Sequence, residues 1–183
     1  MSPLQQVAMG LVIVGLTAQA GDYDLLPDPL GWALAVGGVV RLRNRLPSAG
    51  ALLGLAVLAA VVGLRPYLEL IGSELDVELE PALAWAVSLP QALFCLLLAR
   101  GLAALARDPG EGIAPDEYRA RWFSGLTLAF GVVALAPAVV VGGGLEDAYG
   151  IVAFIAVLSL LTLIYQLFRV HAQPWVEPAE AAG

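Results

Sequence analysis

Long apolar stretches dominate this sequence and limit what it can fold into. A helix rises about 1.5 Å per residue, so about 20 apolar residues cross a hydrocarbon core about 30 Å thick. Six such stretches are predicted to span a membrane, at residues 3–20, 29–46, 47–72, 81–106, 122–142 and 148–168. Each must be helical, because backbone N–H and C=O groups find no water in lipid. The sequence therefore predicts an all-α integral membrane bundle of six transmembrane helices.

Composition supports a membrane protein and excludes several other classes. Of the 183 residues, 60% are hydrophobic and 14% are charged, whereas soluble domains carry about 25% charged residues. With one cysteine, Cys95, and one histidine, His171, the chain cannot form an internal disulfide or a thiolate cage for a metal. The net charge of −7 argues against nucleic acid as a partner, because phosphate binding needs a basic surface.

All six spans belong to a single predicted transmembrane domain covering residues 1–183, which ends in a polar tail at 173–183. An alternative for the first span is a cleaved signal peptide, because Ala18-Gln19-Ala20 resembles a signal-peptidase site. Residues 1–6 contain no Arg or Lys, which favours the uncleaved form. Cleavage would leave five spans in the same orientation.

The basic residues are all arginine, and their positions predict the orientation of the bundle. With six crossings, eight of the nine fall on one side: Arg41, Arg43, Arg45, Arg100, Arg107, Arg119, Arg121 and Arg169. Arginine-rich connections stay in the cytoplasm, so both termini are predicted to be cytoplasmic. The four Trp and five Tyr fall at or near span ends, as expected for the aromatic belts of a membrane protein.

The first outer loop contains the most specific local pattern. Asp28 is placed to cap the second span, Pro29 suits its first turn, and Trp32 is predicted to anchor it at the interface. The loop also resembles a pattern in small uncharacterised bacterial multi-span membrane proteins, Asp-x-Leu-Pro-Asp-x-x-Gly-aromatic, followed by a span that ends in basic residues. The matching residues are Asp24, Leu26, Pro27, Asp28, Gly31 and Trp32, with Arg41, Arg43 and Arg45 after them. The resemblance implies a hairpin module and brings no activity with it.

The same loop is the candidate metal site. Asp22, Asp24 and Asp28 could supply the several oxygen ligands that a hard divalent cation requires. The alternative is structural, since a capped turn between two spans explains the same residues.

Arg65, Glu69 and Gln91 are the candidates for contact with a substrate or a lipid. Arg65 lies toward the outer end of the third span, and Glu69 follows one helical turn later, so a surface ion pair is expected. An arginine that instead faces the bundle would hold an anionic group. Gln91 is a strongly polar residue near a span centre, next to Pro90, which removes a backbone hydrogen bond and can kink the helix.

Polar and small residues share one face on each of three spans, and we predict that they join helices together. These faces hold Ser88, Gln91 and Cys95 on the fourth span, Ser124, Thr127 and Gly131 on the fifth, and Ser159, Thr162, Gln166 and Arg169 on the sixth. The alternative is that they line a small polar path. Gly50-x-x-x-Gly54 in the third span is a predicted site of close helix contact.

The sequence contains no nucleotide-binding loop, no nucleophile–base pair and no carboxylate near a span centre. We therefore predict a non-enzymatic protein of the bacterial plasma membrane without a cofactor, an accessory or subunit that packs against other membrane proteins or itself. The first alternative is a small transporter or channel for cations or small polar solutes, with Gln91 and Arg65 facing the path. The second is a metal-dependent membrane enzyme that uses Asp22, Asp24 and Asp28.

Overall fold

The computed structural model describes residues 1–15, 19–20, 23–24, 28–64, 81–110, 112–143 and 149–176. In this part of the chain there are six helices: α1 (Pro3–Gly15), α2 (Asp28–Arg41), α3 (Ala49–Val62), α5 (Pro81–Arg107), α6 (Glu117–Gly143) and α7 (Tyr149–Val170). Two short strands, β1 (Gln19–Ala20) and β2 (Tyr23–Asp24), pair antiparallel between α1 and α2. The prediction of a helical bundle is confirmed, and the sequence pattern did not reveal the two-residue strands.

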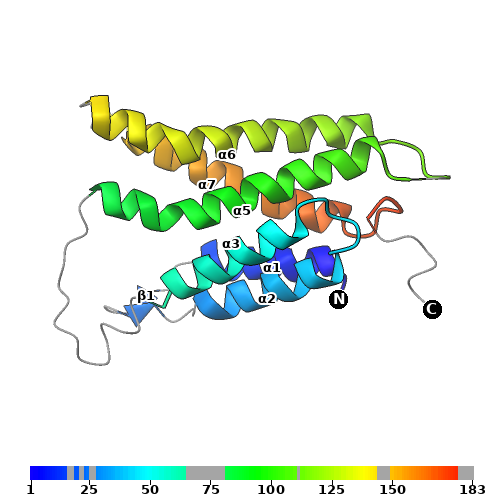
Figure 1. Cartoon of the computed structure of the whole chain (residues 1–183), viewed down its shortest axis with the longest axis horizontal. Helices are drawn as coiled ribbons and strands as arrows, with labels where there is room; N and C mark the ends of the chain where they lie inside the picture. Colours follow the sequence, from blue (N-terminus) through cyan, green and yellow to red (C-terminus); the bar gives the residue numbers. More distant parts are fainter. Residues whose placement is uncertain are drawn as a thin grey trace.

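The helices form a closed ring in chain order. Each described helix packs against the next one along the chain, and α7 returns to pack against α1 (Figure 1). The N-terminus, the α2–α3 turn, the α5–α6 connection and the end of α7 all lie at one end of the bundle (Figure 1). We call this end the basic end, because the eight arginines among the described residues lie at or within two turns of the helix ends and connections found there.

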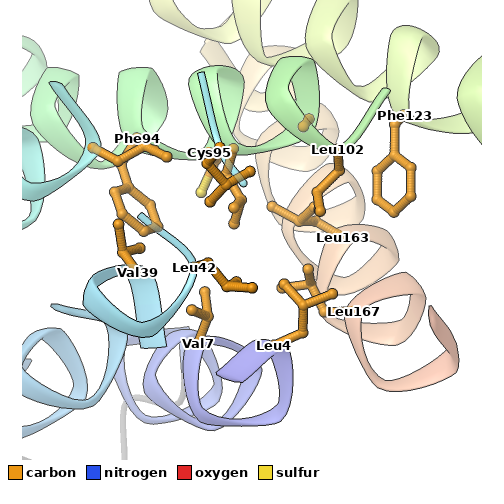
Figure 2. Close-up of a cluster of buried hydrophobic side chains, with 14 of the residues drawn as sticks. Leu4, Val7, Val39, Leu42, Phe94, Cys95, Leu102, Phe123, Leu163 and Leu167 are labelled. Atoms are coloured by element: carbon orange, nitrogen blue, oxygen red, sulfur yellow. The ribbon is translucent and has the colours of Figure 1, made fainter. Parts of the chain in front are cut away.

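Apolar side chains fill the centre of the ring. Figure 2 shows residues from α1, α2, α5, α6 and α7 that point toward one another, among them Val7, Val39, Phe94 and Leu163. All four are fully buried. The centre of the ring is therefore a packed core of apolar side chains.

Two of the four tryptophans belong to this interior, so the predicted interfacial placement is wrong for them. Trp32 is buried and packs edge-on against Phe94, with ring centroids 5.3 Å apart. Trp175 is buried against Phe123, at a centroid distance of 6.5 Å. A large ring gains most from contact on all sides, and the interior provides that contact at both positions.

The contact between α1 and α2 depends on glycine. A Cβ atom on Gly10 would lie 2.4 Å from the carbonyl oxygen of Gly31, and one on Gly38 would lie 2.6 Å from that of Pro3. Such distances exclude any side chain, so the two backbones touch directly. Gly50 and Gly54 make no close helix contact within the described part of the chain, because a Cβ on either would meet no atom within 4 Å, so the contact predicted there stays a prediction. Both glycines are exposed.

Two of the described helices are long and apolar enough to cross a membrane, Trp85–Arg107 within α5 and Gly150–Val170 within α7. The apolar helices α1 and α3 are shorter, with 13 and 14 residues. The two long helices differ in their surroundings: 56% of the α5 span is buried inside the bundle, but only 22% of the α7 span. The ring therefore leaves most of α7 uncovered.

Candidate functional site

The acidic loop does not assemble a metal site in the described residues. Asp22 lies outside them, Asp24 ends strand β2, and Asp28 begins α2, with Pro29 in its first turn as predicted. A Cβ on Gly63 would lie 3.1 Å from the Cβ of Asp28, so the start of α2 meets the end of α3. Among the described side chains, no three His, Cys, Asp or Glu residues come together.

Of the three residues proposed to contact a substrate or lipid, Arg65 and Glu69 lie outside the described residues, and Gln91 lies within α5. Gln91 lines a cavity of about 220 Å³ between α5, α6 and α7. Ser88 and Cys95 line the same cavity, opposite Phe130 of α6 and Leu160 of α7. The shared face expected on the fourth span thus borders a cavity that is otherwise apolar.

Four of the polar residues predicted to join helices have hydroxyls that bond to their own helix. The hydroxyls of Ser124, Thr127 and Thr162 each donate to the carbonyl four residues earlier, at 2.7, 2.9 and 2.7 Å. Ser88 donates to the carbonyl of Trp85 at 2.8 Å. These bonds satisfy the hydroxyls locally, which is the usual alternative to a bond between helices. The predicted role is therefore wrong for Ser88, Thr127 and Thr162, whereas Ser124 also accepts a hydrogen bond from Arg107 of α5 and so does join two helices.

A groove of about 520 Å³ runs between α6 and α7, and it starts near the basic end. We call it the α6–α7 groove; it is lined by Tyr118, Arg121, Trp122, Gly125, Leu126, Leu158, Ser159 and Thr162. Tyr118 and Trp122 are exposed and stack edge-on with ring centroids 6.3 Å apart. The groove thus combines a charged and aromatic mouth with apolar walls and two hydroxyl groups.

A second polar arrangement holds the basic end together. The guanidinium of Arg45, after α2, donates to the carbonyl of Trp175 at 3.0 Å and more weakly to that of Pro109 at 3.4 Å. Arg45 therefore joins the α2–α3 turn to the α5–α6 connection and to the segment after α7. The Nε of Arg45 and the indole N–H of Trp175 are buried without a partner in the described residues.

No known protein family, curated protein or solved structure matches this chain. The resemblance of the first loop to small bacterial membrane proteins therefore stays a prediction. Neither the α6–α7 groove nor the Arg45 junction was predicted. Tyr118, Trp122 and Leu126 follow one another at intervals of four residues, so the sequence places them on one face of a helix. This face forms one wall of the groove. The sequence does not show that α7 packs beside this face and forms the other wall of the groove.

Proposed function

We propose that this chain is a multi-pass protein of the bacterial plasma membrane, with six crossings and cytoplasmic termini, that acts as a non-enzymatic subunit packed against other membrane proteins. Large apolar side chains exposed on the outside of the helices support the membrane placement. On α7 they are Ile151, Phe154, Val157, Leu158, Leu161, Tyr165 and Phe168. Water-soluble monomers rarely expose patches beyond about 300–600 Å², and here the stripe follows the whole helix.

The basic end supports the orientation. Arg41 donates to the carbonyl of Met1 at 3.1 Å, so the N-terminus and the end of α2 lie together. Arg107 at the end of α5 bonds to Ser124 near the start of α6. Since arginine-rich ends stay in the cytoplasm, the basic end is assigned to that side.

The observation that carries the subunit role is the exposed glycine pair of α3. Gly50 and Gly54 lie one turn apart on a surface that also exposes Val57, Leu58 and Val61. In this chain glycine brings two helices into backbone contact, as Gly10 and Gly31 do between α1 and α2. A helix of a partner protein, or of a second copy, is the neighbour that such a surface accommodates.

Transport remains the second candidate because of the cavity beside Gln91. The carboxamide of Gln91 has no hydrogen-bond partner among the described residues, and it borders about 220 Å³ of space. Against transport, apolar side chains such as Val39 and Leu163 pack the centre of the ring (Figure 2). A polar solute would need a continuous polar path, so we favour the subunit role.

The subunit role is tested by the native mass of the protein purified in mild detergent. The wild type is expected to run as a stoichiometric complex with a second membrane protein or a second copy. Gly54→Leu, which places a side chain on the glycine surface, is expected to dissociate it. Gly150→Leu is the matched control, because Gly150 is also exposed with no atom within 4 Å of its Cβ. A wild-type protein that is a lone monomer would contradict the proposal.

A further inference from the structure

The mouth of the α6–α7 groove carries a positive charge that makes no ion pair among the described residues. Arg121 lines the groove and is exposed, and none of the carboxylates in the described part of the chain pairs with it. It lies in the second turn of α6, near the basic end, beside the exposed rings of Tyr118 and Trp122. Arginine and amphipathic rings at this level occupy the headgroup region of a bilayer. The chemistry of the mouth therefore fits an anionic headgroup.

A hydroxyl farther inside the groove points to the same type of ligand. Ser159 is only 7% exposed, it lines the groove, and its hydroxyl has no hydrogen-bond partner among the described residues. A ligand that brings an acceptor oxygen to this depth would give the hydroxyl a partner.

The length of the groove favours a lipid over a partner helix as its occupant. On α6 it extends over residues 118–126, about 12 Å along the axis. A partner helix that crosses the membrane needs a surface of about 30 Å. The headgroup, the ester region and the first part of an acyl chain need only the shorter length.

We propose that the α6–α7 groove binds an anionic phospholipid. Arg121 holds its phosphate, Ser159 donates to an ester oxygen, and Leu126 and Leu158 line the upper acyl chain. The inference rests on the membrane placement proposed above, but it does not depend on the subunit role or on the glycine surface of α3.

Native mass spectrometry of the detergent-purified chain with added phosphatidylglycerol or phosphatidylcholine tests the charge. The wild type is expected to retain phosphatidylglycerol in preference to phosphatidylcholine, and Arg121→Gln to weaken phosphatidylglycerol binding about fivefold. Arg100→Gln is the matched control, because Arg100 is exposed on α5 and does not line the groove. Equal binding by the wild type and Arg121→Gln would overturn the proposal.

Gly125→Leu tests the groove itself without disturbing the fold. A Cβ on Gly125 meets no atom within 4 Å, so a leucine there fills open space. The variant should unfold at the wild-type temperature or above it and bind phosphatidylglycerol about tenfold more weakly. Ser159→Ala should weaken binding of both lipids while keeping the preference for phosphatidylglycerol.

Three outcomes overturn the lipid site and differ from failure of the proposed function. Unchanged lipid binding by Gly125→Leu shows that lipid binds elsewhere. Displacement of phosphatidylglycerol by millimolar inorganic phosphate shows an anion site without a lipid. A smaller native mass for Gly125→Leu than for the wild type shows that the groove holds a helix. The membrane placement itself is tested by a separate experiment, the labelling of introduced cysteines on intact cells that is described in the Discussion.

Discussion

Glycine acts in two opposite ways in this chain, and the difference lies in what surrounds the missing side chain. At Gly10 the backbone of α2 occupies the place of the missing side chain, since a Cβ would lie 2.4 Å from the carbonyl oxygen of Gly31. At Gly54 the space is open and faces outward. The first glycine is required by the fold, whereas the second is available to a neighbour.

The two roles predict opposite effects of the same substitution. Gly10→Ala should lower the free energy of unfolding by about 1–3 kcal/mol, because two packed backbones must separate. Gly54→Ala should leave it unchanged or raise it by up to about 1 kcal/mol, because alanine favours helix and meets no obstacle. Denaturant titration of the two variants in detergent measures both. Equal destabilisation would mean that α1 and α2 do not touch at Gly10.

Residue positions along the chain were predicted better than residue directions. The sequence placed the tryptophans near span ends, but it could not tell that Trp32 faces Phe94 while Trp122 is exposed. The reason is physical: in lipid both the inside and the outside of a bundle are apolar, so hydropathy does not distinguish them. The acidic loop and the Arg65–Glu69 pair stay predictions, since most of these residues lie outside the described part.

At the scale of elements, the ends of helices depend on local capping that hydropathy does not detect. The fifth span was predicted to begin at residue 122, but α6 begins at Glu117. Asp116 explains the earlier start, because its carboxylate accepts from the backbone N–H of Arg119 at 3.1 Å and pairs with the Arg119 side chain at 3.2 Å. The helix thus begins with a charged turn that a search for apolar residues leaves out.

Arg45 connects three elements, and its removal should loosen the segment that follows α7. Arg45→Ala removes the bonds to the carbonyls of Pro109 and Trp175 and should cost about 1–2 kcal/mol. Amide hydrogen exchange at residues 171–176 should become faster. Arg45→Lys should recover part of the protection, because an ammonium group can still donate to a carbonyl but is more strongly hydrated than a guanidinium.

Arg43→Ala is the control for the Arg45 junction, because Arg43 is exposed in the same turn. Its exchange pattern should equal that of the wild type. If Arg45→Ala also left residues 171–176 as protected as in the wild type, the segment would be held by the packing of Trp175 against Phe123 alone.

At the scale of the whole molecule, the closed ring explains why fold and site differ in how well they could be predicted. Apolar length and the alternation of loops suffice to predict a helical bundle, because an apolar stretch long enough to cross a membrane must be helical if it lies in lipid. The α6–α7 groove depends on which faces of two helices meet. That choice is made by packing across the ring, where α7 contacts both α6 and α1.

The orientation of the ring gives the most direct test of the membrane placement. Gly150, at the start of α7, and Ala114, in the α5–α6 connection, are both exposed and lie at opposite ends of the bundle (Figure 1). Each is replaced by cysteine in a Cys95→Ser background, which removes the native thiol. A membrane-impermeant maleimide should label Gly150→Cys on intact cells and Ala114→Cys only after the membrane is opened, because the proposed orientation places the basic end in the cytoplasm. The reverse pattern would invert the assigned orientation, and recovery of the protein in buffer without detergent would contradict the membrane placement.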